Sequence, residues 1–272
     1  LREDILDIVQ YAHKKEFALR LFTNGTLIDE EAADRIKELH PLAVEISLYG
    51  MEAAVHEAVT GVPGSFSRTT DACRLLADRN IRTVVKSTVM KVNMFQFDKI
   101  KDFADSIGAE FRFSLKIMSK IDGSDGPRQL QPTEKEMEEF LAAGDWLPRE
   151  IRKKSRLSLL CAAGINAAYI SPYGDVFPCV NLREYCGNIR ENSFAEVWRG
   201  AAGFKKLRDI KPEDLRACFE CGDLVRYCYR CPGLSLQEEG DLLACSQAND
   251  RRMARVVKQV MEQRSPEPSI KN

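Results

Sequence analysis

The chain has 272 residues, of which 44% are hydrophobic, and its 40 lysines and arginines nearly balance its 41 aspartates and glutamates, leaving a formal charge of −1. This composition suits a globular protein with a sizeable core, and it lacks the positive field that attracts nucleic acid or an anionic membrane surface. No run reaches the roughly 18 apolar residues of a membrane span, and no basic and apolar leader opens the sequence. We therefore expect a cytoplasmic protein with no nucleic-acid or membrane partner.

The first 117 residues alternate apolar runs with amphipathic segments. Helices are expected at about 5–12, 29–39, 67–78 and 96–106, and strands at 18–22, 43–50, 82–90 and 110–117. Repeated strand and helix order with short connections predicts parallel strands joined by right-handed crossovers, in an α/β sheet or part of a barrel.

Ligands of such folds bind at the carboxyl ends of the strands. Asn24, Ser47 and Lys86 are the candidate cofactor-binding residues in this region. Each also has a plain structural interpretation, because a polar residue near a strand end is often a satisfied group at the edge of the core, and Asn24 before Gly25 equally suits a turn. His13, His40 and His56 are expected on exposed helical patterns and receive no catalytic role.

The composition changes after residue 117. Residues 118–157 are expected to form a linker with a bridging helix, which begins at a capping box made by Thr133 and Glu136. Residues 158–250 form a small cysteine-rich domain, and residues 251–272 form a C-terminal helix and tail.

Eight of the nine cysteines are confined to this second part of the chain. They are Cys161, Cys179, Cys186, Cys218, Cys221, Cys228, Cys231 and Cys245. Four of them read C-x2-C-x6-C-x2-C, a spacing that lets each close pair offer two sulfurs to one metal centre. Thiolate ligands suit zinc and iron-sulfur clusters alike, so the spacing leaves both metals open. Cys73 stands apart and is expected to be a buried thiol on a helix.

A hairpin is expected between the first two of these cysteines. Residues 168–179 place apolar strands around a Pro-Tyr-Gly-Asp turn, giving C-x12-G-x4-C from Cys161 to Cys179. Such a hairpin brings its two cysteines close together.

This pattern, followed by the C-x2-C run and a last cysteine, resembles the SPASM domain of radical S-adenosylmethionine (SAM) enzymes. The segment 187–198, with Gly187, Asn188 and Trp198, looks like the stretch usual between the two cysteine groups of that domain. Residues 22–26 and 46–50 are similar to the third and fourth strand segments of the partial (βα) barrel that precedes it. The resemblance thus implies an α/β fold, with residues 1–117 as the C-terminal part of the barrel.

The resemblance also implies a ligand set. Cys161, Cys179 and Cys231 would hold a first auxiliary [4Fe-4S] cluster, while Cys218, Cys221, Cys228 and Cys245 would hold a second. The fourth iron of the first cluster would be met by Cys186 or left open, since the position before Gly187 is commonly an apolar core residue. The x6 and x2 spacings differ from the usual pattern, which leaves the roles of Cys228 and Cys231 interchangeable. Ser47 matches the serine that commonly meets SAM.

The implied activity is hydrogen abstraction by a SAM-derived radical, in the maturation of a peptide or protein, with a flavodoxin or ferredoxin as electron donor. SAM and a third [4Fe-4S] cluster would be needed, yet the C-x3-C-x2-C motif of that cluster does not occur in the sequence. We therefore expect a chain truncated at its N-terminus and inactive by itself. Val180 in place of Asp after Cys179 weakens the case for formylglycine formation. A non-catalytic metal-binding scaffold, holding iron-sulfur clusters or zinc, is the alternative.

Overall fold

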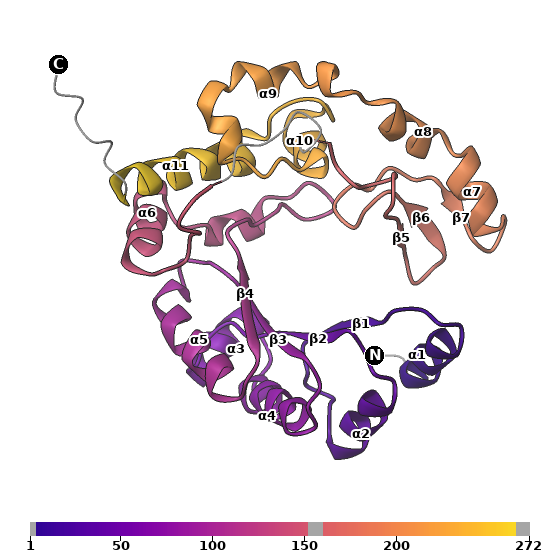
Figure 1. Ribbon diagram of the computed structural model, residues 1–272, viewed down its shortest axis with the longest axis vertical. Helices are drawn as coiled ribbons and strands as arrows, with labels where there is room; N and C mark the ends of the chain where they lie inside the picture. The colour runs from indigo at the N-terminus through magenta and orange to yellow at the C-terminus, as the bar shows by residue number, and fades with distance from the viewer. Residues whose placement is uncertain (1–3, 152–159, 265–272) are drawn as a thin grey trace. The chain divides into compact units, whose positions relative to one another are not determined.

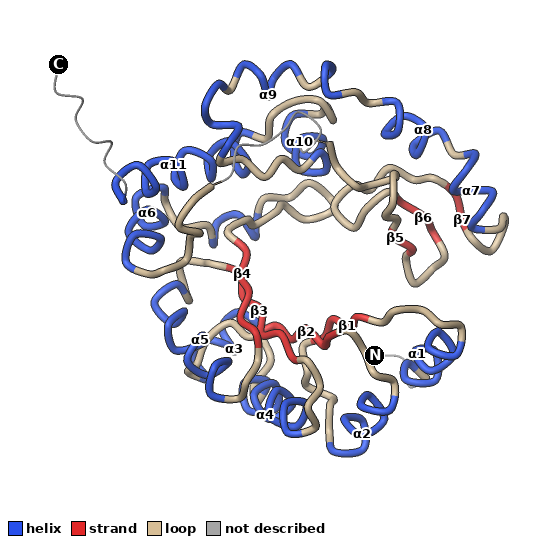
Figure 2. The backbone as a smooth tube through the Cα atoms, in the orientation of Figure 1, coloured by secondary structure: helices blue, strands red, loops and turns tan. Residues whose placement is uncertain are grey.

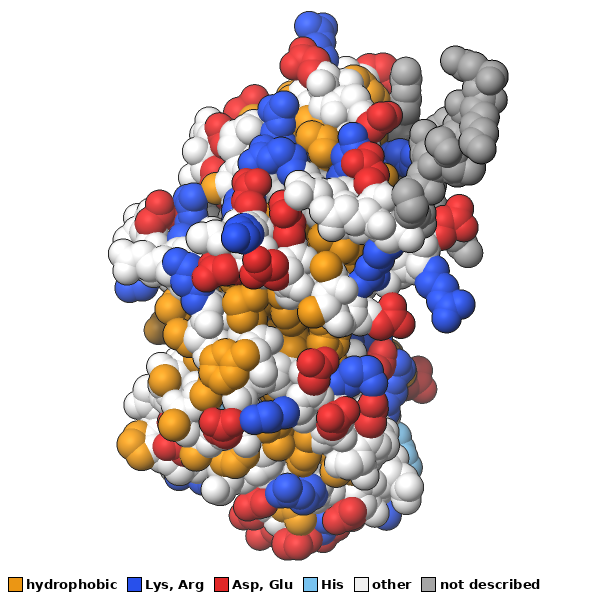
Figure 3. Space-filling view, turned by 90° about the vertical axis from the view of Figure 1, so that its left-hand side faces the viewer, with side chains coloured by type: hydrophobic (Ala, Val, Ile, Leu, Met, Phe, Trp, Pro, Cys, Tyr) orange, Lys and Arg blue, Asp and Glu red, His pale blue; other side chains and the backbone are white. Residues whose placement is uncertain are grey.

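The computed structural model describes residues 4–151 and 160–264 (Figure 1). The chain divides into two compact units, Leu1–Lys116 and Ile117–Asn272. Basic and acidic side chains are interspersed over the face drawn in Figure 3, as expected of a nearly neutral chain. Among the described helices, none combines the length and the apolar character needed to cross a membrane.

The first unit repeats strand and helix, as the sequence predicts. Its elements are α1 (Ile5–Lys14), β1 (Arg20–Thr23), α2 (Glu30–Glu38), β2 (Ala43–Ser47), α3 (Ala53–Thr60), α4 (Ser65–Asp78), β3 (Thr83–Thr88), α5 (Phe97–Ser106) and β4 (Glu110–Ser114). A short 3-10 turn, Met94–Gln96, precedes α5. The expected strands and four helices are confirmed with shifted ends. The sequence reading missed α3, whose eight residues follow a loop without a capping side chain.

The four strands of this unit form one parallel sheet in the order β1-β2-β3-β4. Because the spatial order follows the chain order, crossovers of one hand place the connecting helices on the same face. Figure 2 shows α2, α4 and α5 along one side of the red strands. This sequential arrangement is that of a (βα) barrel segment rather than of a doubly wound sheet.

The two faces of the sheet differ sharply in polarity. The face under the helices carries fully buried apolar side chains, among them Ile46, Leu48 and Val85, and Phe97 of α5 packs edge-on against Phe111 and Phe113 of β4. The opposite face, one residue out of phase, carries a polar series that includes Arg20, Glu45, Ser47, Lys86, Thr88, Arg112 and Ser114. A sheet with one apolar and one polar face presents the polar face to a ligand or to solvent.

The second unit holds short helices and a small sheet. Its elements are α6 (Glu134–Ala143), β5 (Tyr169–Ile170), β6 (Asp175–Phe177), β7 (Gly187–Asn188), α7 (Phe194–Gly200), α8 (Ala202–Asp209), α9 (Arg216–Glu220), α10 (Pro232–Glu239) and α11 (Arg252–Arg264). 3-10 turns lie at Gly126–Leu130, Pro212–Asp214 and Gly222–Arg226, and a π-helical turn, Gln247–Arg251, leads into α11.

The helix at the expected linker, α6, packs beside α11 (Figure 1). Its N-terminus is the predicted capping box: Thr133 Oγ1 accepts the amide of Glu136, and the Glu136 carboxylate accepts the amide of Thr133. Arg255 of α11 pairs with Glu134 at 2.7 Å, and Gln259 donates to Glu138 at 2.8 Å. Residues far apart in the sequence thus belong to one packed pair of helices.

The expected hairpin is confirmed as β5 and β6, which pair antiparallel, with β7 added beside β6. Its turn is closed by Ser171, whose amide donates to the Asp175 carbonyl at 2.8 Å. Gly174 has φ of +92°, a value that side chains rarely adopt, and a Cβ there would lie 2.7 Å from Asn188 Oδ1. The glycine of the C-x12-G-x4-C pattern is therefore required by backbone conformation and by close packing alike.

Candidate metal centres and cofactor site

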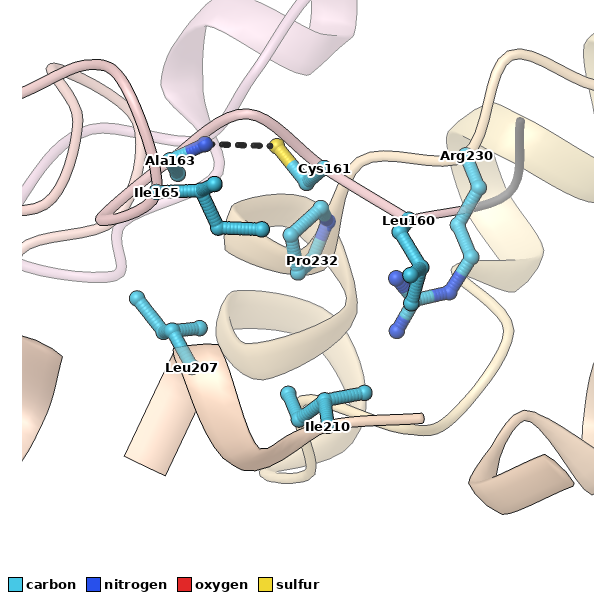
Figure 4. Close-up of a pocket in the computed structure, with 8 residues that line it drawn as sticks. All are labelled: Leu160, Cys161, Ala163, Ile165, Leu207, Ile210, Arg230 and Pro232. Atoms are coloured by element: carbon cyan, nitrogen blue, oxygen red, sulfur yellow. Dashed lines mark hydrogen bonds between the residues drawn. The ribbon is translucent and has the colours of Figure 1, made fainter. Parts of the chain in front are cut away.

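All nine cysteines lie in the described part of the chain and are free thiols. Cys161 and Cys179, at the two ends of the hairpin segment, both pack against one small core of Ala163, Leu182, Leu207 and Leu242. The amide of Ala163 donates to Cys161 Sγ at 3.4 Å (Figure 4). The hairpin thus brings these two cysteines to the same core, and a backbone donor already faces one of the sulfurs.

Cys231 precedes a helix whose first turn packs near this pair. It is the N-cap of α10, and the next residue, Pro232, lines a small cavity together with Cys161 (Figure 4). Gly233 packs so closely on the loop after Cys179 that a Cβ would lie 2.4 Å from the Asn181 carbonyl oxygen. The first turn of α10 is therefore held against the segments that carry Cys161 and Cys179.

A second group forms around Cys245. Its Sγ lies 3.9 Å from that of Cys221. Burial raises the pKa of Cys245 to about 12, and the nearby thiol groups of Cys221, Cys228 and Cys218 act in the same direction. The thiols of Cys221, Cys228 and Cys218 are therefore close enough to Cys245 to influence its ionisation.

Cys186 belongs to a different environment from the other cysteines. It packs against the core formed by Val176, Val197 and Phe204, next to Trp198. Burial raises its pKa, and so does the carboxylate of Glu184. A thiol held in an apolar core beside a carboxylate is a poor thiolate, because both surroundings disfavour the negative charge. Trp198 stacks on Phe194 and lies 4.8 Å from Phe204 between ring centroids, so it packs with this core.

Within the described residues, no three His, Cys, Asp or Glu side chains converge at the spacing of ligands around a metal ion. The donor chemistry nevertheless fits thiolate-bound clusters, because Cys161 and Cys179 pack on one core and the thiols of Cys218, Cys221 and Cys228 lie near Cys245. Protons must leave these thiols when a metal binds, so cluster assembly and local side-chain rearrangement are coupled.

The ninth cysteine, Cys73, is fully buried on α4, as expected. Burial raises its pKa to about 12, so it stays protonated. It has the properties of a structural apolar residue. Cys73→Ala is therefore a suitable control for substitutions of the other eight cysteines.

The polar face of the sheet holds a cavity of about 370 Å³ near the carboxyl ends of β2, β3 and β4. Its lining comprises Ser47, Tyr49, Lys86, Ser87, Thr88, Arg112, Phe113 and Ser114. The strand register explains this, since Ser47 pairs with Lys86, and Lys86 with Arg112, across the sheet. Two of the three candidate cofactor residues, Ser47 and Lys86, thus share one cavity.

Asn24, the third candidate, lies outside this lining. Its Oδ1 accepts from the amide and the hydroxyl of Thr26, at 3.1 and 3.0 Å, and its carbonyl accepts from Thr69 of α4. These contacts are those of the turn that follows β1.

Sequence reasoning missed Glu45, which organises the polar face. Its side chain is 2% exposed and pairs with Lys86 at 2.8 Å and with Arg20 at 2.6 Å. Burial by itself would raise the pKa of Glu45, but the hydrogen bonds and charges of Lys86 and Arg20 hold it below its ordinary value. Lys86 is therefore oriented by an ion pair, and its ammonium lies 5.0 Å from the centroid of the Phe22 ring. The sequence signal for this role was the position of Glu45, a carboxylate within the otherwise largely apolar strand β2.

The expectation that all three histidines are exposed is wrong for His56. It is 1% exposed on α3, and its Nδ1 accepts the amide of Tyr49 at 3.2 Å, while its Nε2 has no partner among the described residues. Its burial follows from packing near the rings of Tyr49 and Phe66. The sequence pattern did not predict the burial of His56, because α3 itself was not expected.

Comparison with known proteins identifies both units. The family model of the radical SAM superfamily matches residues 1–107, and that of the SPASM domain, described as an iron-sulfur cluster-binding domain, matches residues 161–222. The second match includes Cys161, Cys179, Cys186, Cys218 and Cys221. The chain therefore carries a radical SAM superfamily domain and a SPASM domain. Iron-sulfur clusters and SAM are the cofactors of this class.

Among curated relatives, an AdoMet-dependent heme synthase of Methanosarcina barkeri is 28% identical over 272 aligned residues, covering 89% of this chain and 77% of the relative. The mycofactocin maturase MftC of Mycobacterium ulcerans is 30% identical over 244 residues, covering 82% and 64%.

The solved structure of Streptococcus suis SuiB bound to SAM has a TM-score of 0.66 at 14% identity, covering 89% of this chain and 62% of that one. SuiB has also been solved with its precursor peptide SuiA, at a TM-score of 0.65 and 14% identity, with 90% and 61% covered. At such identity the likeness concerns the fold. The chain spans less than two thirds of the length of MftC and of SuiB.

Proposed function

We propose that this chain is part of a radical SAM maturase that modifies a peptide or protein, with two auxiliary [4Fe-4S] clusters in its second unit. The observation that carries the proposal is that Cys161 and Cys179 share one core, whereas the thiols of Cys218, Cys221 and Cys228 lie near Cys245. Cys161, Cys179 and Cys231 would hold one cluster, and Cys218, Cys221, Cys228 and Cys245 the other. Cys186 would remain an apolar core residue, which leaves the first cluster with an open position.

The polar face of the first unit is proposed to bind SAM. Its cavity of about 370 Å³ falls within the usual range of small-molecule sites. Ser47 would donate from its hydroxyl to a polar group of the ligand, and Lys86, oriented by Glu45, would attract its carboxylate. When bound, SAM and its own cluster supply abstraction of a hydrogen atom, while the chain orients the ligand and excludes water.

A peptide substrate is supported by two relatives of this chain, the maturase MftC and the peptide-bound SuiB. An electron donor of the flavodoxin or ferredoxin kind is part of the proposal. Synthesis of heme is a second candidate, favoured by the relative of which this chain covers 77%. Binding of a labelled precursor peptide would support the first, whereas a shift in the visible absorbance of an added heme precursor would support the second.

The test of the two-cluster assignment is metal analysis after anaerobic reconstitution. We expect about eight irons per chain and a broad visible absorbance that bleaches on reduction, since each [4Fe-4S] cluster contributes four irons. Cys73→Ala is the matched control and should keep all the iron, because this buried thiol lies in the other unit. A colourless protein with two zinc ions would instead favour the metal-binding scaffold. No C-x3-C-x2-C motif occurs among the 272 residues, so the measurement is cluster content rather than turnover.

A further inference from the structure

Arg230 lies between the two groups of cysteines. In the chain it separates Cys228, of the group of four, from Cys231, of the group of three. In space it lines the cavity beside Cys161, as Figure 4 shows. This cavity measures about 20 Å³, room for about one water molecule and far too little for a substrate. Binding of a substrate therefore does not explain why a charged side chain lines this cavity.

Two residues that line this cavity also contact a core that contains a cysteine of the second group. Leu160 and Ile210 line the cavity of Cys161 and pack against the core of Leu215 and Cys218. One layer of side chains thus separates Cys161 from Cys218. Arg230 is the charged member of the lining of the Cys161 cavity, whose other members are aliphatic side chains, Pro232 and Cys161 itself.

The guanidinium of Arg230 has one nitrogen that is hydrogen-bonded and one that has no partner among the described residues. One terminal nitrogen donates to the carbonyl of Leu242. The buried Nε has no partner among the described residues. Arginine remains protonated and offers five donors in one plane, so it can serve two acceptors on different sides.

We propose that Arg230 is a tuning residue shared by the two cluster sites: its guanidinium charge lies at the cavity of Cys161, whose wall residues Leu160 and Ile210 pack against Cys218, and it raises the reduction potentials of both clusters. The proposal rests on the two-cluster function above. An added electron makes a thiolate-bound cluster more negative, and a buried cation and N–H···S hydrogen bonds stabilise that state. A carboxylate limits this effect, because Asp250 lies in the same region and accepts the amide of Cys231 at 2.7 Å.

The test compares reduction potentials in the reconstituted full chain by electron paramagnetic resonance during a redox titration. Arg230→Gln and Arg230→Met should lower the ratio of reduced to oxidised cluster at a fixed potential about tenfold, or ~59 mV for one electron. A unit charge acting over about 10 Å at an effective dielectric constant of about 20 has this scale. Arg230→Lys, which keeps the charge, should retain most of the wild-type ratio.

Arg226→Gln is the matched control, because Arg226 is an exposed arginine of the same segment and its charge is screened by solvent. It should leave the potentials unchanged. Unaltered potentials in an iron-replete Arg230→Gln or Arg230→Met protein would overturn the proposal, and so would loss of iron in both, since Arg230 would then be needed for assembly. Failure of the wild-type chain to take up iron would refute the proposed function instead.

Discussion

The Sγ atoms of Cys221 and Cys245 lie 3.9 Å apart although 24 residues separate them in the chain. Ser246, directly after Cys245, is fully buried, and its hydroxyl donates to Glu238 of α10 at 2.7 Å. The Glu238 carboxylate also accepts the amide of Ala248 and the side-chain amide of Asn249. A polar network centred on Glu238 therefore holds the segment that follows Cys245 against α10.

Paired cysteine substitutions should reveal the two groups. Cys245→Ala or Cys161→Ala should each cost about four irons. Cys221→Ala combined with Cys245→Ala should cost no more than one of them, because both act on one cluster, whereas Cys161→Ala with Cys245→Ala should remove all the iron. Iron per chain and the resonance spectrum of the reduced protein are the measurements.

Cys186→Ala should keep the full iron content, because Cys186 packs in a different core from Cys161 and Cys179. A loss of about four irons in this variant would instead make Cys186 the fourth ligand of the first cluster. Cys73→Ala again gives the baseline for replacing a buried thiol.

Glu45→Gln should destabilise the first unit by about 1–2 kcal/mol at pH 7, measured by urea unfolding. The variant removes two ion pairs of a buried carboxylate, and the partial exposure of Arg20 and Lys86 keeps the loss moderate. Because the folded pKa of Glu45 is depressed, its contribution is complete above the ordinary value of 4.5 and is lost as the pH falls through the folded pKa. The difference between the two proteins should therefore shrink in acid. Glu110→Gln, at an exposed pair, should cost less; an equal cost would contradict the argument.

His56→Asn should flatten the pH dependence of stability between pH 7.5 and 5.5. Burial lowers the pKa of His56 from 6.5, while Glu57 acts in the opposite direction. Below about pH 6.5 the unfolded chain takes up a proton that the folded chain refuses, so the wild type loses stability as the pH falls. The asparagine Oδ1 can still accept the Tyr49 amide. His13→Asn, at an exposed position, is the control, and a wild-type slope in the His56 variant would refute this account.

Thr133→Ala should loosen the first turn of α6 at a cost of about 1 kcal/mol, because the amide of Glu136 loses its acceptor. Faster hydrogen exchange at the start of α6 would report the loss. Thr133→Ser keeps the hydroxyl and should behave like the wild type, so equal exchange in the alanine and serine variants would refute the role of the cap.

Local chemistry allowed much of the fold to be predicted from sequence. Strand and helix periodicity predicted the four parallel strands, Thr133 and Glu136 predicted the start of α6, and the turn at Gly174 predicted the hairpin. These features depend on residues within a few positions of one another. The two domains of the family resemblance were likewise carried by short motifs, and both family models match.

Only tertiary packing decided which residues share a site. The burial of His56 and Glu45, and the packing of α6 on α11, arise between segments that no local pattern connects. The same holds for the cysteines. Their spacing leaves Cys228 and Cys231 interchangeable, and the close approach of α10 to Asn181 and of Cys245 to Cys221 supports the assignment that we propose. Sequence spacing fixes how many thiols a segment can offer, whereas long-range packing decides which thiols meet, because sulfurs from distant segments meet only after the chain has folded.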